Sequence, residues 1–219
     1  MKAEKKFTKG VFLLQNNMKK LNLIIIPISI FISMICISCT QVLVGGAASG
    51  GIMLVQERTP EQAGKDILIK TKIEEAFFST NYDDIFSKIK VIVYEGRVLL
   101  VGTVKNDSFK NTAVSIVKKL KDVKEIANYI VVGNESVIDY LKDTRISLEF
   151  RAKLLTDKNI SEVNYTSTTE NRILYIIGVS QSKEELNLVL SHASNVAGVK
   201  KIINLVIDKN SPSRKPADE

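Results

Sequence analysis

The side chains that most often carry catalysis or bind metals are scarce in this chain of 219 residues. His192 is the only histidine, and the two cysteines, Cys36 and Cys39, both stand in or beside an apolar stretch near the N-terminus. A zinc site, a disulfide framework and histidine-assisted nucleophilic catalysis all need more such groups than the rest of the chain holds. Asp83 and Asp84 are adjacent, but they fall in a predicted loop, where their expected role is solvation. The chain is therefore predicted to be no enzyme and to hold no cofactor or metal.

The positive charge of the chain is concentrated at its N-terminus. Of the 31 basic and 24 acidic residues, six and one respectively lie within residues 1–38, which leaves a net charge of +2 for the rest. Binding to nucleic acid usually needs a strongly basic domain. We therefore do not expect nucleic acid as a partner.

An uncharged apolar run occupies residues 21–38, directly after the basic residues Lys19 and Lys20. A run of this length fits a transmembrane helix, a signal peptide or a buried core helix, and its flanks distinguish them. At its end stands the sequence CISC, residues 36–39. A short basic region before the run and a small residue followed by cysteine after it favour a processed signal.

The segment that begins at Met18 resembles the signal peptide and lipobox of bacterial lipoproteins. In that pattern a small residue precedes the modified cysteine, as Ser38 does, whereas Cys36 stands where leucine is usual. The resemblance implies that translation starts at Met18, that residues 1–38 are an upstream extension and signal peptide, and that Cys39 becomes the lipidated N-terminus. The alternative is an uncleaved N-terminal membrane anchor. Both interpretations place the remaining residues at a membrane surface outside the cytoplasm.

Residues 39–60 are predicted to link the lipidated cysteine to the folded part. They contain the sequence GGAASGG at positions 45–51, in which no side chain is large enough to pack a core. Glycine and serine keep such a segment flexible. The segment is therefore expected to act as a tether.

The rest of the chain contains an internal repeat. Gly102 matches Gly178 and Asn128 matches Asn204, both at an offset of 76 residues, and Asp66 matches Asp143 at an offset of 77. A difference of one residue in the loop before the first strand explains the change in offset. The chain is predicted to hold two copies of one module of about 75 residues.

Hydrophobic periodicity predicts the order αββαβ in each copy. Asp66 and Asp143 are expected to be the N-caps of the first helices. The other predicted elements of the first copy are strands at 89–94 and 98–104, a helix at about 108–120 and a strand at 125–132; in the second copy a strand begins at 173, a helix covers about 182–196 and a strand covers 200–207. The predicted fold class is α+β: two tandem modules, each a three-stranded mixed sheet with two helices on one face.

The second strand of each predicted sheet is apolar on both faces, at residues 98–101 and 173–177. A sheet covered by helices on one side only should instead alternate between apolar and polar residues. The uncovered face must therefore meet another apolar surface. We expect the two modules to pack against each other, and a partner protein is the alternative.

These residues resemble the BON module, named for bacterial osmotic-stress and nodulation proteins. The resemblance is carried by Asp66-x-x-Ile69 at the helix start, by Val98-x-Leu100-x-Gly102-x-Val104, and by the closing Val-x-x-Ile-x-Asn that ends at Asn128 and Asn204. It covers nearly everything from about residue 61 to 207. It implies a first BON domain at 61–133, a second at 134–208 and a disordered tail at 209–219.

A lipobox, a small-residue tether and two BON modules are together similar to dual-BON outer-membrane lipoproteins. This resemblance implies a non-enzymatic protein, lipid-anchored on the periplasmic face of the outer membrane, that maintains outer-membrane integrity; anchoring to the inner membrane is the alternative. It implies that the first helix of the second module contacts anionic phospholipid, phosphatidylglycerol or cardiolipin. The matching candidates are Tyr140, Leu141, Lys142, Arg145, Leu148 and Arg151. Arg145 stands where those proteins have an aromatic residue, and a scaffold that docks an envelope protein is the alternative function.

Overall fold

The computed structural model describes residues 56–134 and 137–214. The apolar run, Cys39 and the predicted tether lie outside these residues, so the structure does not bear on them. Within the described ranges, no helix combines the length and the apolar character needed to cross a bilayer.

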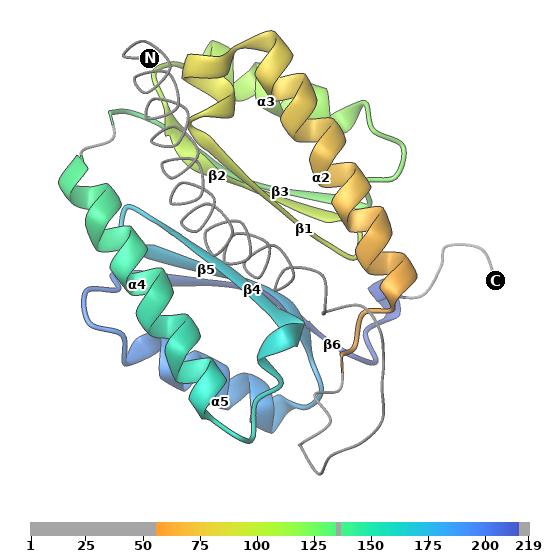
Figure 1. Cartoon of the computed structure of the whole chain (residues 1–219), viewed down its shortest axis with the longest axis vertical. Coiled ribbons are helices and arrows are strands. Elements are labelled where there is room, and N and C mark those ends of the chain that lie inside the picture. Colours follow the sequence, from red (N-terminus) through yellow and green to blue (C-terminus); the bar gives the residue numbers. More distant parts are fainter. Residues whose placement is uncertain (1–55, 135–136, 215–219) are drawn as a thin grey trace, which may run out of the picture. The chain divides into compact units, whose positions relative to one another are not determined.

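The first module follows the predicted order of elements (Figure 1). β1 pairs antiparallel with β2, β2 pairs parallel with β3, and β2 is the central strand. The one element that the sequence did not predict is a short π-helical turn at Tyr82–Phe86. The bounds are α2 Pro60–Thr80, β1 Ile89–Tyr94, β2 Arg97–Val104, α3 Asp107–Lys118 and β3 Glu125–Val132.

The second module repeats this arrangement, with β5 between β4 and β6. A 3₁₀ turn at Glu162–Asn164 replaces the π-helical turn of the first module. The bounds are α4 Val137–Thr156, β4 Tyr165–Glu170, β5 Ile173–Ser180, α5 Lys183–Ser194 and β6 Lys201–Asp208. The predicted fold class, two tandem αββαβ modules with mixed sheets, is confirmed.

Each module has its own core between its helices and one face of its sheet. In the first, Ile73 and Phe77 of α2 and Val117 of α3 are fully buried against Val98 and Leu100 of β2. The second module packs the matching set, in which Ile146, Phe150 and Leu154 come from α4. The helices lie on that face because their apolar residues recur three and four positions apart, which places them on one side of a helix.

The predicted role of Asp66 as an N-cap is wrong. Helix α2 begins at Pro60 and is capped by Thr59, whose hydroxyl accepts from the backbone N–H of Gln62. Asp66 lies inside the helix, and its buried carboxylate accepts from the backbone N–H groups of Glu95 and Gly96, at 2.7 and 2.8 Å. The carboxylate binds amides of a distant turn rather than those of its own helix.

Asp143 has the same role in the second module and is likewise no N-cap. It lies within α4 and accepts from the backbone N–H groups of Asn171 and Arg172, at 2.7 Å each. Both residues have positive φ, at 52° and 64°, as Glu95 and Gly96 do in the first module, at 52° and 77°. Positive φ at both central residues is typical of a two-residue hairpin turn. A buried carboxylate on the first helix thus holds each hairpin turn.

The faces of the two sheets that carry no helices pack against each other, as predicted. Six buried side chains form the centre of this interface. One comes from the end of β1 and the others from β2 and β5, and they are Tyr94, Leu99, Val101, Tyr175, Ile177 and Val179. The rings of Tyr129 and Tyr175 lie 5.1 Å apart. The second sheet therefore covers the apolar face of the first and shields it from solvent.

Polar contacts fix the register of this interface at both of its ends. At one end, Arg97 donates to the carbonyl oxygens of Leu205 and Gly178, at 2.7 and 2.9 Å. At the other, the Thr103 hydroxyl donates to the Glu170 carboxylate at 2.7 Å. Arg97 is only 8% exposed, and this burial lowers the pKa of its guanidinium below the ordinary value for arginine.

Replacing Arg97 with alanine should lower the free energy of unfolding by about 2–4 kcal/mol, because a buried and a partly buried carbonyl oxygen lose a charged donor. Urea denaturation followed by circular dichroism measures this change. The control is Lys105→Ala, which removes an exposed ion pair to Asp84 and should cost less than about 1 kcal/mol. Equal effects of the two variants would contradict a role of Arg97 in joining the sheets.

The predicted disorder of residues 209–219 does not hold for residues 209–214, which the structure describes. A 3₁₀ turn at Pro212–Arg214 places the Arg214 guanidinium on the Glu95 carboxylate, with two contacts of 2.9 and 3.0 Å. Arg214 also donates to the backbone carbonyl of Glu57 at 2.8 Å. A charged, bidentate pair orders this part of the tail, which composition alone does not reveal.

Candidate functional site

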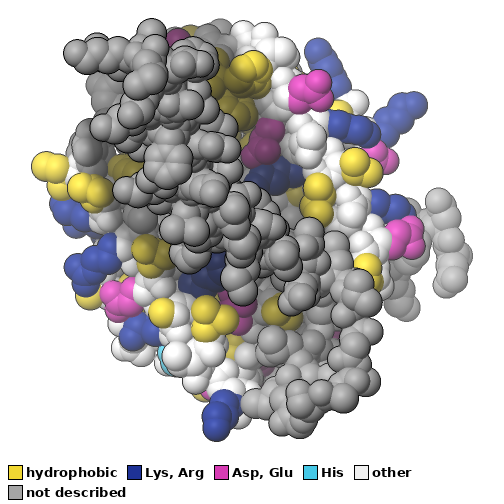
Figure 2. All heavy atoms as spheres, viewed as in Figure 1, with side chains coloured by type: hydrophobic (Ala, Val, Ile, Leu, Met, Phe, Trp, Pro, Cys, Tyr) yellow, Lys and Arg dark blue, Asp and Glu magenta, His cyan; other side chains and the backbone are white. Residues whose placement is uncertain are grey.

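The solvent-facing side of α4 carries all six residues that the sequence proposed for lipid contact. Tyr140, Leu141 and Leu148 are exposed by 53% to 65%. The side chains of Arg145 and Arg151 are each 68% exposed. The helix brings the six together because its opposite side is occupied by the buried core residues. Figure 2 shows apolar and basic side chains next to one another over this helix.

Sequence reasoning missed two further members of this surface, Ile138 and Leu155, which are also more than 60% exposed. They extend a stripe at positions 138, 141, 145, 148, 152 and 155, whose spacing alternates between three and four residues. That spacing places all six positions on one side of a helix. The repeat was visible in the sequence, but only the burial of the other side shows that this stripe faces solvent.

The cations on α4 are paired with neighbouring acids at the surface. Arg145 lies 3.6 Å from Glu149, and Arg151 lies 2.9 Å from Glu162. Exposed pairs of this kind contribute little free energy and are screened by salt. The guanidinium groups can therefore exchange these partners for another anion, such as a phosphate, without a large loss.

His192 lies on α5 and takes no part in this surface. Its Nε2 is 2.8 Å from the Asp157 carboxylate, and this hydrogen bond is the main cause that holds the pKa of Asp157 below its ordinary value. In residues 56–134 and 137–214, no group of three or more potential metal ligands occurs. We assign the His192–Asp157 pair to the local structure of the second module.

A cavity with a volume of about 500 Å³ lies beside the hairpin turn of the first module. Of its three acidic residues, Asp66 is engaged by the turn amides, Glu95 by Arg214, and Asp122 lies 3.7 Å from Lys72. In its wall, Asp66 thus holds the turn, and the pair of Glu95 and Arg214 holds the tail. The cavity is separate from the α4 surface, since none of its lining residues belongs to α4.

The fold and the exposed helix define a protein of two αββαβ modules, one of which presents an apolar and basic stripe to solvent. A family model for the BON domain matches residues 65–134 and 142–207. The chain therefore belongs to the BON domain family, as the sequence motifs indicated.

Three curated relatives resemble the chain over most of its length. An uncharacterised protein from the gshII 5′ region of Anaplasma centrale is 36% identical over 68% of this chain and 99% of its own length. The outer membrane lipoprotein DolP of Haemophilus influenzae is 27% identical over 76% of this chain and 86% of its own. A 21 kDa hemolysin of Actinobacillus pleuropneumoniae is 27% identical over 70% of this chain and 72% of its own.

Proposed function

We propose that this protein is a non-enzymatic envelope lipoprotein whose second module contacts anionic phospholipid through α4. The observation that carries the proposal is the solvent-facing apolar stripe on that helix, which contains the cation Arg145 and is flanked by Lys142 and Arg151. An amphipathic helix with a basic flank is suited to the interface of an anionic bilayer. The similarity to an outer membrane lipoprotein supports the same assignment.

The anchor in this proposal is an acyl group on Cys39, on the periplasmic face of the outer membrane. Lipid chains contribute about 0.8 kcal/mol for each buried methylene, and stable anchoring takes more than one chain or signal. The anchor alone then holds the protein at the membrane. The task left for α4 is to orient the modules and to select the lipid, and through these contacts the protein would help to maintain outer-membrane integrity.

The depth to which α4 inserts into the lipid depends on Arg145. It occupies the middle of the apolar stripe, between Leu141 and Leu148. Its long side chain can cover apolar surface while its guanidinium stays at the level of the headgroups. Each basic residue near an anionic surface contributes about 1 kcal/mol. We therefore propose binding that depends on headgroup charge, with shallow rather than deep insertion.

Residues 40–219 should bind vesicles that contain phosphatidylglycerol or cardiolipin and should bind neutral vesicles weakly. In NMR spectra, the amide shifts within the second module should be confined to residues 138–155 and should shrink as salt is added, because the attraction is screened. The double substitution Leu141→Ser and Leu148→Ser should weaken binding about tenfold or more, through lost apolar contact.

The matched control is Leu188→Ser, which removes an exposed leucine from α5, the other helix of the same module. This variant should bind like the unmodified protein. Shifts spread over the whole second module, or equal losses for the two leucine sites, would count against α4 as the lipid-binding element.

A protein-docking scaffold is the second candidate function, and one observation favours it. The alternating spacing of three and four residues in the α4 stripe is the pattern by which one helix packs along another. On this alternative, anionic vesicles cause no shifts in α4 and the stripe binds an envelope protein. The vesicle experiment therefore separates the two functions.

A further inference from the structure

We propose that the first module carries a second lipid contact, formed by the aromatic residues Phe78, Tyr82 and Phe86, here called the aromatic cluster. The protein then meets the bilayer with the end of the two modules that presents both this cluster and the start of α4. This inference rests on the proposed membrane role and names a further part of the same contact surface.

The three rings of the aromatic cluster are in mutual contact. Their centroids are 5.4 to 5.5 Å apart, with Phe78 edge-on to the other two rings. Phe86 packs against the core of the first module and so fixes the cluster in place. Phe78 and Tyr82, in contrast, are 57% and 54% exposed. The core holds the cluster rigidly while two of its rings face solvent.

Aromatic side chains with this exposure are suited to a membrane interface. Tyrosine and other amphipathic rings are enriched at the level of the headgroups, where one edge is apolar and the other is wet. Rings that are already held in place lose little conformational entropy on binding. Contiguous exposed apolar groups on a soluble domain usually mark a site of interaction.

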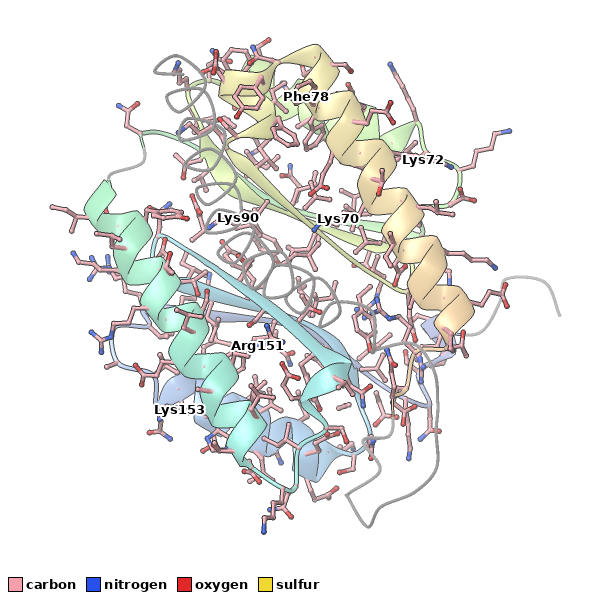
Figure 3. All side chains as sticks on the ribbon, viewed as in Figure 1. Lys70, Lys72, Phe78, Lys90, Arg151 and Lys153 are labelled. Carbon is pink, nitrogen blue, oxygen red and sulfur yellow. The ribbon has the colours of Figure 1, made fainter. Side chains whose placement is uncertain are left out.

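The contacts of α2 place the aromatic cluster at one end of the first sheet. Asp66, near the start of the helix, binds the hairpin turn at Glu95 and Gly96. Phe78 lies twelve residues further along α2, and twelve residues of helix span about 18 Å. The cluster is therefore at the far end from that turn, where β2 finishes and β1 begins. Figure 3 shows Phe78 close to the C-terminal end of α2.

The start of α4 lies at this same end. Asp143, near the start of α4, binds the hairpin turn that contains Asn171. That turn contacts the first module close to the finish of β2, because Asn171 donates to the Thr103 hydroxyl at 3.2 Å and Thr103 donates to Glu170. The aromatic cluster of one module and the exposed Leu141 of the other thus share one end of the two-module unit.

The predicted tether is long enough to allow this orientation. Glu57 lies at the opposite end, where it is held by Arg214 beside the first hairpin turn. The 17 residues between Cys39 and Glu57 can span up to about 58 Å when extended. An eight-residue strand is only about 27 Å long. An anchor at Cys39 therefore permits the aromatic cluster to reach the bilayer.

The absence of tryptophan from the sequence makes a direct test available. Single tryptophans are introduced at Phe78, at Leu141 and at Ile67 in the full lipid-anchored chain, reconstituted in vesicles that contain phosphatidylglycerol with or without brominated lipid. Ile67 is the matched control, because it is 65% exposed and lies on the same side of α2, eleven residues from Phe78.

The proposal expects the Phe78→Trp emission to shift to the blue and to lose about half of its intensity with brominated lipid, as for a ring at the interface. Ile67→Trp should show neither change. Tyr82→Trp provides a second reporter in the cluster if Phe78→Trp disturbs the fold, which circular dichroism reports.

The outcomes separate this inference from the proposed function. Quenching at Leu141→Trp without quenching at either cluster position overturns the second contact and leaves the role of α4 intact. Equal quenching at Phe78→Trp and Ile67→Trp overturns the end-on orientation. If none of the tryptophans is quenched, both the inference and the proposed lipid contact fail, and the cluster is left to a protein partner.

Discussion

Replacing Gly102 with alanine should destabilise the protein by more than about 4 kcal/mol and leave little folded first module. A Cβ atom added to Gly102 would lie 2.0 Å from the backbone carbonyl oxygen of Lys88 and 3.0 Å from the Cα atom of Ile89. Both neighbours are backbone atoms, and Ile89 pairs with Gly102 across the β1–β2 ladder. The clash can be relieved only by opening the sheet. Yield of folded protein and urea denaturation measure the effect.

Gly178 faces the same restriction in the second module, where an added Cβ atom would lie 2.1 Å from the carbonyl oxygen of Asn164. The matched control is Gly64→Ala, inside α2, because nothing lies within 4 Å of the added Cβ. Alanine at that helical position should increase stability by about 0.5–1 kcal/mol. A folded Gly102→Ala variant with unchanged stability would contradict the close approach of the Lys88 and Ile89 backbone to Gly102.

Replacing Asp66 with alanine should cost about 3–5 kcal/mol of unfolding free energy, because a buried carboxylate that satisfies several donors is lost. It accepts from the N–H groups of Glu95 and Gly96 and from the guanidinium of Arg58 at 2.9 Å. Removing it leaves two turn amides unpaired while both turn residues keep positive φ. Thermal and urea unfolding measure the loss.

Two further alanine substitutions serve as comparisons for Asp66→Ala. Asp107→Ala removes an exposed acid from the first turn of α3 and should cost less than about 1 kcal/mol. Asp143→Ala should show a large loss in the second module, since that carboxylate also binds two turn amides. A cost for Asp66→Ala as small as that for Asp107→Ala would contradict the role assigned to the buried carboxylate.

The roles of Asp66 and Asp143 could be predicted only in part from the sequence. Their position in the repeat and their link to the first helix were recognised from sequence. An N-cap was the natural interpretation, because aspartate before an apolar helical stripe is a common helix start. The actual partners are amides 28 to 30 residues away. Such contacts depend on how the helix packs on the hairpin, which no local pattern encodes.

The α4 surface was predicted in part for a similar reason. The six candidates came from the resemblance to dual-BON lipoproteins, and all of them lie on the solvent-facing side of the helix. Ile138 and Leu155 were missed, because an apolar residue in a sequence is first assumed to be buried. The aromatic cluster was missed on the same ground, since Phe78 follows the core residue Phe77 directly in the sequence.

The sequence by itself determined the repeat, the order of elements, the α+β class and the BON family. These follow from periodicities of 2 and 3.6 residues and from glycines at matching positions, which are local properties of the chain. It also indicated that the bare sheet faces must be covered, since β2 and β5 are apolar on both sides.

The tertiary structure alone decided which groups join the modules and which end of the protein presents its aromatic rings. Arg97 reaches a carbonyl oxygen 108 residues away, and Arg214 reaches a carboxylate 119 residues away. The physical reason is that these contacts form only once the two sheets have packed. A charged side chain is then buried or exposed according to that packing and not according to its neighbours in the sequence.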